Sequence, residues 1–215
     1  MDKTFLISGL GADYQLFKRV ELPGYEVIHV HWIEPDISDT LASYVSKLID
    51  QYKIQPNAIV IGVSLGGMLT IEIAKQIQLN KAILISSIKN SDEAPWYFSF
   101  FRKLPVYKLI PGQFFTSLGM LIKPVFGKMS KEDGLMFGAM LKNSSPTFIR
   151  WAMHAVLNWQ SKTTVSNVYH ITGNKDMVFN YKNIKGATLI EGGTHIMVFD
   201  KSQQINQLLK EILQK

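Results

Sequence analysis

The residues of this chain that are most able to do chemistry surround Ser64. Residues 62–66 read Gly-Val-Ser-Leu-Gly, between the apolar run at residues 58–63 and a helical pattern at residues 65–77. A sharp turn from strand to helix holds a serine in a strained, exposed position, and the flanking glycines let the two elements approach closely. The helix also directs its free N–H groups and positive dipole end toward charge that develops there. We therefore predict that Ser64 is a nucleophile rather than an incidental serine in a glycine-rich turn.

A serine hydroxyl is a poor nucleophile until a base removes its proton, and five histidines are candidates for that base. His195 follows a Glu-Gly-Gly-Thr loop at residues 191–194, between the last predicted strand and the last predicted helix. The other histidines fall in predicted strands or in a long helical segment: His29, His31, His154 and His170. A structural role suits those four better, so we predict His195 as the general base.

The base needs a carboxylate that fixes its tautomer and stabilises the imidazolium. Asp176 follows a predicted strand at residues 167–173, in the loop next to the one that carries His195. Asp200 is the alternative, but it comes after the histidine and is expected to cap the final helix. The sequence therefore predicts Asp176 as the third member of the group, in the chain order serine, aspartate, histidine.

Six short apolar or alternating runs predict the strands that carry these residues: residues 4–9, 26–32, 58–63, 81–88, 167–173 and 187–191. Helical periodicity predicts helices at residues 12–19, 38–52, 65–77 and 201–213, with Ser38 or Asp39 capping the second of them. Continuous apolar runs are typical of strands that are covered on both faces of a parallel sheet. The alternation of strand and helix predicts an α/β fold.

The rhythm changes at residues 89–164, which we call the insertion. This segment is rich in aromatic residues, methionine and lysine, and we expect helices with breaks near Pro105, Pro111, Pro124 and Pro146. We predict a core domain from residues 1–88 and 165–215, and a helical insertion across the top of its sheet. The apolar side chains of the insertion could line an acyl pocket, although packing is the expected role for any one of them.

Composition excludes several classes of site and partner. The 215 residues include no cysteine, which excludes disulfides, thiolate zinc sites and a cysteine nucleophile. The net charge of +6 comes mainly from residues 90–162, where nine Lys or Arg face four Asp or Glu. A solvated basic surface is favoured there over an anionic partner, and no nucleic acid is expected. The sequence shows neither a signal peptide nor a membrane span, which predicts a cytoplasmic protein, and it indicates no oligomeric state.

The chain resembles the α/β-hydrolase superfamily over nearly its whole length. The resemblance rests on the turn at Ser64, on the His-x-x-Gly-x-x-Asp stretch at residues 170–176 and on the Gly-Gly-x-His loop at residues 192–195. A weaker match is Ser-Gly-Leu-Gly at residues 8–11, where the family usually carries a His-Gly oxyanion loop. The resemblance implies an α/β-hydrolase fold with helices on both faces of a reduced, mostly parallel sheet of about six strands. It also implies that residues 89–164 occupy the place of the family's cap domain.

By the same analogy, the backbone N–H groups of Leu10 and Leu65 form the oxyanion hole, with Gly11 as the alternative to Leu10. The resemblance thus implies a serine hydrolase that cleaves a small-molecule ester or thioester, with an apolar acyl group, through an acyl-enzyme on Ser64. Serine argues against the family's haloalkane dehalogenases and epoxide hydrolases, which use aspartate at this turn. No metal or organic cofactor is needed. Two alternatives stay open: a membrane-peripheral lipid hydrolase and a non-catalytic binding protein on the same fold.

Overall fold

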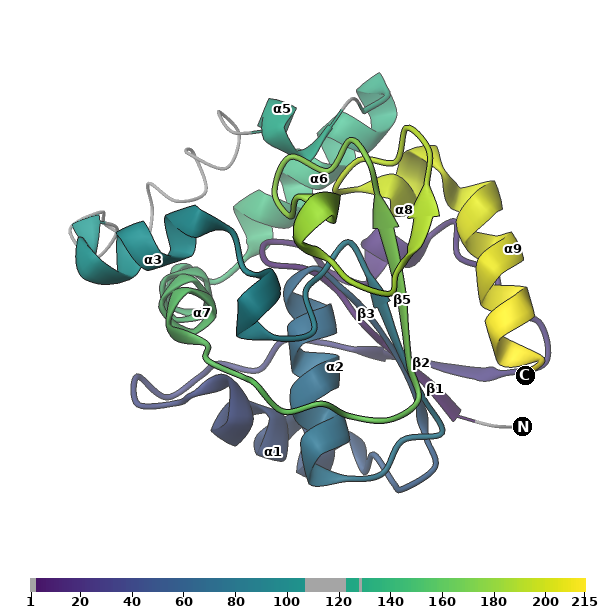
Figure 1. The fold of residues 1–215 in the computed structure, drawn as a ribbon, viewed down its shortest axis with the longest axis horizontal. Coiled ribbons are helices and arrows are strands. Elements are labelled where there is room, and N and C mark those ends of the chain that lie inside the picture. The colour runs from purple at the N-terminus through teal and green to yellow at the C-terminus, as the bar shows by residue number, and fades with distance from the viewer. Residues whose placement is uncertain (1–2, 107–122, 128) are drawn as a thin grey trace.

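A single sheet of six parallel strands forms the centre of the protein (Figure 1). The computed structural model describes residues 3–106, 123–127 and 129–215. The strands are β1 Lys3–Ile7, β2 Glu26–Val30, β3 Ile59–Val63, β4 Lys81–Ile85, β5 Val168–Gly173 and β6 Thr188–Ile190. Their order is β2-β1-β3-β4-β5-β6, which confirms the predicted α/β fold and its reduced sheet of six strands.

The burial of each strand follows its place in the sheet. Every residue of the central strands β3 and β4 is buried, whereas the edge strand β2 is exposed at Glu26 and Val27. Because β1 lies between β2 and β3, the order of strands along the chain reverses at β1. In open parallel sheets, ligands bind beyond the carboxyl ends of the strands at such a switch point. We therefore expect a ligand site among the residues that follow Ile7 and Val63.

Helices cover both faces of the sheet and enclose two hydrophobic cores (Figure 1). On one face, α1 (Leu41–Tyr52) and α2 (Leu65–Gln76) bury Tyr44 and Met68. On the other face, the 3-10 helix η1 (Tyr14–Phe17), α8 (Met197–Asp200) and α9 (Ser202–Leu213) bury Phe17 and Leu209. No helix in the described part of the chain combines the length and apolarity that crossing a membrane requires.

Several predicted details of the helices and strands are wrong. Helix α1 is capped by Thr40, whose hydroxyl accepts from the Ser43 N–H, and neither Ser38 nor Asp39 is its N-cap. Asp39 instead accepts from the Ser43 hydroxyl, because Thr40 already occupies the capping position. Strand β4 ends at Ile85, since Ser86 has a φ of 48° that leaves the strand conformation. The predicted helix at residues 12–19 is the single turn η1.

The insertion is helical where it is described. Between β4 and β5 lie the 3-10 helix η2 (Ser91–Glu93), α3 (Trp96–Lys103), α5 (Lys123–Phe126), α6 (Lys131–Asn143) and α7 (Pro146–Asn158). Pro105 follows the end of α3, Pro124 lies in the first turn of α5 and Pro146 begins α7. Pro111 lies outside the described residues. Figure 1 shows α5 and α6 beyond the end of the sheet toward which the β5 arrow points.

Polar contacts to the buried carboxylates of Asp133 and Glu72 join the insertion to the rest of the protein. The Arg19 guanidinium donates to both carboxylate oxygens of Asp133, at 3.0 and 2.9 Å, and to the Phe199 carbonyl at 2.8 Å. Near the other end of the insertion, the Trp159 indole donates to the buried Glu72 carboxylate of α2 at 2.7 Å. Charge-assisted hydrogen bonds of this kind are the stronger ones in proteins, so both contacts hold the insertion against the core.

The contact between Arg19 and Asp133 predicts that part of the free energy of unfolding depends on pH. Burial alone raises the pKa of the Asp133 carboxyl, but hydrogen bonds from Ser130, Lys18 and Arg19 outweigh it and lower this pKa below the usual 3.8. Such a carboxyl contributes its full stabilisation at pH values above its pKa in the unfolded protein. The stabilisation is lost as the pH falls through its lower pKa in the folded protein. We expect Asp133→Asn to lower the free energy of unfolding by about 1.5–3 kcal/mol at neutral pH.

Urea denaturation of wild type and Asp133→Asn, at neutral pH and below pH 3.8, tests this expectation. The difference between the two proteins should shrink at the acid pH. Glu132→Gln is the matched control, because that side chain is 81% exposed and its ion pair with Lys18 should contribute little. Equal effects of the two substitutions at neutral pH would contradict the assignment.

Candidate active site

Ser64 occupies a strained turn between β3 and α2. Its φ of 55° and ψ of −117° lie in a region that residues other than glycine rarely adopt. Two hydrogen bonds hold this conformation: the Ser64 N–H donates to the Ile85 carbonyl at 3.0 Å, and the Ser87 hydroxyl donates to the Ser64 carbonyl at 2.6 Å. The turn is therefore supported by β4 and by the residues that directly follow it.

Two glycines make the turn sterically feasible. A Cβ atom on Gly62 would lie 2.1 Å from the Gly66 carbonyl oxygen, and a Cβ on Gly66 would lie 2.1 Å from the Ile7 carbonyl oxygen. Both distances are far below van der Waals contact with backbone atoms that cannot move away cheaply. Glycine at these positions thus lets β3, α2 and the end of β1 come together around Ser64.

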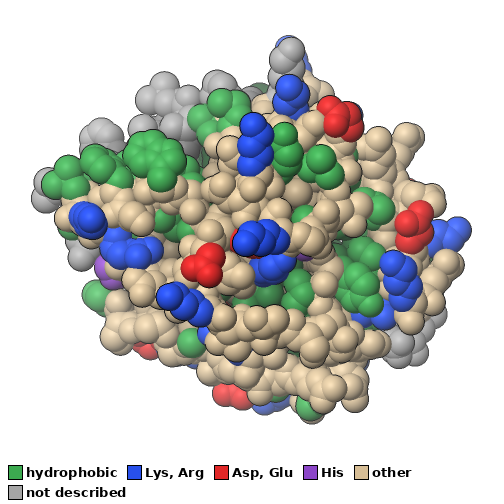
Figure 2. All heavy atoms as spheres, viewed as in Figure 1, with side chains coloured by type: hydrophobic (Ala, Val, Ile, Leu, Met, Phe, Trp, Pro, Cys, Tyr) green, Lys and Arg blue, Asp and Glu red, His purple; other side chains and the backbone are tan. Residues whose placement is uncertain are grey.

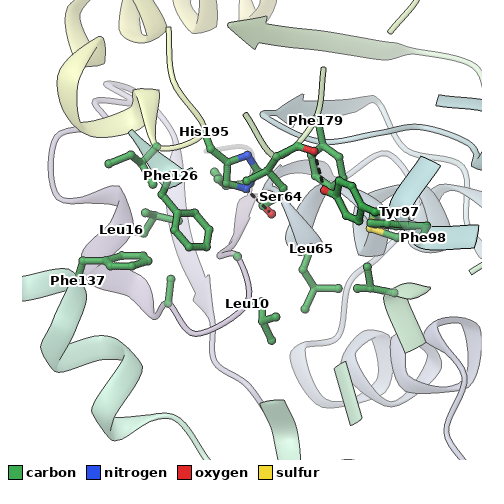
Figure 3. A pocket seen from close by; sticks show the side chains of 17 residues that line it. Leu10, Leu16, Ser64, Leu65, Tyr97, Phe98, Phe126, Phe137, Phe179 and His195 are labelled. Atoms are coloured by element: carbon green, nitrogen blue, oxygen red, sulfur yellow. Dashed lines mark hydrogen bonds between the residues drawn. The ribbon is translucent and has the colours of Figure 1, made fainter. Parts of the chain in front are cut away.

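The structure brings Ser64, His195 and Asp176 together. The Ser64 Oγ lies 2.9 Å from the His195 Nε2 (Figure 3). The His195 Nδ1 lies 2.9 Å from the Asp176 Oδ2. A carboxylate can only accept, so Nδ1 carries the proton in this pair and Nε2 is free to accept from the Ser64 hydroxyl. His195 is 3% exposed and Asp176 6%, which removes most competing water from both contacts.

Backbone groups hold the aspartate and bring its loop against the histidine loop. The Asp176 Oδ1 accepts from the N–H groups of Val178 at 2.8 Å and Phe179 at 2.9 Å. A Cβ on Gly173 would lie 2.1 Å from the Gly193 carbonyl oxygen, so the end of β5 packs directly on the His195 loop. The Lys175 N–H donates to the same Gly193 carbonyl at 2.9 Å. These contacts fix Asp176 relative to His195.

The rival titratable residues lie elsewhere. Asp200 is exposed at the end of α8, and its predicted capping role is wrong, because Lys201 is the N-cap of α9. His170 is buried in β5 with its Nε2 at 3.0 Å from the Ser87 carbonyl, and burial lowers the pKa of its imidazole. His29 packs edge-on against the ring of Tyr14. Neither imidazole is hydrogen-bonded to Ser64 or Asp176 in the described part of the chain, so neither competes with His195.

The two candidate oxyanion groups lie at the carboxyl ends of β1 and β3. Leu65 is the first residue of α2, where a helix leaves its N–H groups without intrahelical partners. The loop after β1 packs on Ser64, since a Cβ on Gly9 would lie 3.2 Å from the Ser64 Cβ. Leu10 and Leu65 line one pocket together with Ser64 and His195. Both backbones are therefore close to where a substrate carbonyl would sit.

That pocket has a volume of about 200 Å³ and is lined mostly by apolar side chains (Figure 3). Its lining residues are Gly9, Leu10, Ala12, Leu16, Val63, Ser64, Leu65, Met68, Tyr97, Phe98, Phe126, Phe137, Val156, Val178, Phe179, His195 and Ile196. The rings of Phe126 and Phe179 lie 5.6 and 5.5 Å from the His195 ring, and Figure 3 shows them on opposite sides of it. Such an apolar wall excludes water from the histidine.

The sequence predicted Ser64, His195, Leu10 and Leu65 at the site but left open which apolar residues of the insertion line the pocket. Tyr97 and Phe98 come from α3, Phe126 from α5 and Phe137 from α6, whereas the other aromatic residues of the insertion that the structure describes do not line the pocket. Trp151 contacts Tyr44 of α1, and Trp96 is 79% exposed. No local signal separates these groups. Among the described residues, no three His, Asp or Glu side chains cluster in a way that could hold a metal ion.

Comparison with known proteins places this geometry in a family. The model of the Alpha/beta hydrolase family matches residues 4–208. An esterase from Exiguobacterium antarcticum is similar in structure, with a TM-score of 0.77 at 17% identity, covering 100% of this chain and 92% of that one. A bromoperoxidase from Bacillus anthracis has a TM-score of 0.74 at 14% identity, covering 100% and 92% of the two chains.

An epoxide hydrolase from Bacillus megaterium has a TM-score of 0.72 at 14% identity, covering 100% of this chain and 94% of that one. No curated protein sequence matches the chain. The neighbours thus share the fold and differ in the reactions that their names describe. The family match extends over nearly the whole sequence, from β1 to α9. The chain belongs to the Alpha/beta hydrolase family.

Proposed function

We propose that this protein is a serine hydrolase that cleaves a carboxylic ester or thioester through an acyl-enzyme on Ser64. The observation that carries the proposal is the pair of 2.9 Å contacts linking Ser64 to His195 and His195 to Asp176, at the wall of an apolar pocket. A shared fold does not decide the reaction, but the nucleophile does. Serine at the turn favours acyl transfer over epoxide opening, for which the family uses aspartate.

In the proposed mechanism, His195 Nε2 accepts the Ser64 hydroxyl proton while Ser64 Oγ attacks the substrate carbonyl carbon. The N–H groups of Leu65 and Leu10 stabilise the negative charge on the carbonyl oxygen. The tetrahedral intermediate collapses, and the leaving alcohol or thiol takes the proton from His195. His195 then removes a proton from water, which attacks the acyl-enzyme and releases the acid and Ser64. Asp176 stabilises the imidazolium in both halves.

The pocket supports a substrate with a short apolar acyl group. Its walls come from both hydrophobic cores: Leu65, Met68 and Phe98 belong to one, and Leu16 and Phe137 to the other. We assign residues 89–164 to a cap over a core of residues 1–88 and 165–215, because α3, α5 and α6 all contribute to these walls. A non-catalytic binding protein is disfavoured, since the pocket opens directly onto Ser64 and His195.

Covalent labelling tests the nucleophile. A fluorophosphonate should modify Ser64 alone, because only a serine with a paired base and oxyanion donors reacts quickly. Ser64→Ala should abolish labelling and leave the melting temperature nearly unchanged. Ser161→Ala is the control, a buried serine whose hydroxyl contacts Lys75 and which does not line the pocket, so its loss should leave labelling at Ser64 intact. Labelling that survives in Ser64→Ala, located by mass spectrometry, would overturn the proposal.

Substitution of Asp176 and of Asp200 tests which carboxylate orients His195. Asp176→Asn should lower kcat by on the order of 10⁴, since the amide favours the wrong histidine tautomer. Asp200→Asn should have little effect, because that side chain is exposed at the end of α8. The kinetics of both variants toward a p-nitrophenyl ester decide between them, and the reverse ranking would assign the role to Asp200.

The apolar pocket predicts a dependence on acyl chain length. Each buried methylene contributes up to about 0.8 kcal/mol, so kcat/KM for p-nitrophenyl esters should rise up to about fourfold per carbon over the first few carbons. It should then level off, because the pocket holds only about 200 Å³. A kcat/KM that is highest for acetate and falls with every added carbon would contradict the apolar acyl site while leaving the Ser64 chemistry in place.

A second candidate, a hydrolase that acts at a lipid surface, is favoured by the outer face of α3. Trp96, Phe100 and Leu104 recur every fourth residue and are 79%, 48% and 52% exposed. Arg102 and Lys103 lie in the last turn of the same helix. Figure 2 shows hydrophobic side chains gathered over this region, with Lys and Arg side chains beside them. Exposed aromatic and basic residues together are typical of surfaces that bind anionic membranes.

Co-sedimentation with vesicles tests this candidate. The protein should bind phosphatidylserine-containing vesicles more strongly than pure phosphatidylcholine vesicles, and Trp96→Ser should weaken the binding. Leu135→Ser is the matched control, because Leu135 is 68% exposed on a different helix, α6. Absence of binding to either vesicle would exclude the lipid-surface candidate and would not affect the serine hydrolase proposal.

A further inference from the structure

We propose that Tyr97, on helix α3 of the insertion, is a positioning residue for Asp176 and thereby for His195. The inference rests on the serine hydrolase function proposed above. It means that the insertion does more than line the pocket, because one of its side chains supports the hydrogen bonds that orient the base.

A continuous set of hydrogen bonds leads from Tyr97 to Ser64. The Tyr97 hydroxyl donates to the Val178 carbonyl at 2.7 Å (Figure 3). The Phe179 N–H donates to the Asp176 Oδ1 at 2.9 Å. The Val178 carbonyl and the Phe179 N–H belong to the same planar peptide group. A hydrogen bond to its oxygen fixes the plane and polarises its N–H, which strengthens the bond to the carboxylate.

The Tyr97 hydroxyl is a hydrogen-bond donor at neutral and at moderately alkaline pH. Burial raises the pKa of the Tyr97 hydroxyl above its usual value of 10, and the negative charge of Asp176 raises it further. The hydroxyl therefore stays protonated and remains a donor. Its ring lines the pocket while its hydroxyl reaches the loop after β5, so one side chain contacts both the substrate space and the support of Asp176.

A second contact ties α3 to the same loop. The ring of Phe98 packs edge-on against that of Phe179 at 6.2 Å, and Phe179 in turn packs against His195 at 5.5 Å. Helix α3 thus holds the loop by a hydrogen bond at Val178 and by ring packing at Phe179. Displacement of α3 would loosen the peptide that holds Asp176, even though Ser64 and His195 lie on other elements.

The test is Tyr97→Phe, which removes the hydroxyl and keeps the ring in the pocket. Its readout is the rate at which a fluorophosphonate modifies Ser64, resolved into a maximal rate and a half-saturating concentration. We expect the maximal rate to fall roughly tenfold, the effect of one lost hydrogen bond, with the half-saturating concentration changed less than about twofold. Tyr44→Phe is the matched control, because its buried hydroxyl donates to the Ile33 carbonyl at 2.8 Å, away from the pocket. It should cost stability and leave the labelling rate unchanged.

A double-mutant cycle separates positioning from general loosening of the fold. In an Asp176→Asn background, Tyr97→Phe should change the maximal rate less than about twofold, because the carboxylate that it supports is already gone. An equal loss in both backgrounds, an unchanged rate in the single variant, or a change confined to the half-saturating concentration would each overturn the inference. If the wild type labels at Ser64 and Tyr97→Phe is fully active, only this inference fails. If the wild type does not label at all, the proposed function fails together with it.

Discussion

The arrangement of this protein depends on how closely its backbone segments approach each other around Ser64. Helix α2 presses on β3 through Gly62 and on the end of β1 through Gly66, at positions where a single added carbon would collide with a carbonyl oxygen. This contact forces the chain into the strained conformation of Ser64 and brings the loop after β1 against that residue. The same close contact places Ser64 at the switch point of the sheet and leaves helix N–H groups free beside it, which supports the active site proposed there.

The insertion is held to this core by contacts that differ in kind and position. Asp133 binds Arg19 near η1, Trp159 binds Glu72 of α2, and Tyr97 binds the loop after β5. The contact between Trp159 and Glu72 is buried and the other two are partly buried, so loss of the first would leave the most costly unsatisfied partner. Because α3, α5 and α6 also form the pocket walls, the stability of the insertion and the shape of the substrate space depend on the same packing.

Much of the fold could be predicted because strands and helices leave local patterns. The buried strands β3 and β4 appear as continuous apolar runs, and α2 begins directly after Ser64. Errors occurred where local signals compete: Ser38, Asp39 and Thr40 are all good N-caps, and backbone geometry selected Thr40. Strand β4 stops early because Ser86 turns toward the histidine loop, a conformation that its apolar surroundings do not indicate.

The sequence by itself determined the sheet, the turn at Ser64 and the choice of His195 and Asp176 as candidates, since periodicity and loop position are properties of short segments. Catalytic roles for these residues stay a prediction, although their side chains meet at hydrogen-bond distance. Only the tertiary structure decided which aromatic residues of the insertion face the pocket and that Tyr97 reaches Val178. The physical reason is that these contacts join segments about 80 residues apart along the chain. The periodicity within one segment reports which of its faces is buried, but it does not identify the segment that packs against that face.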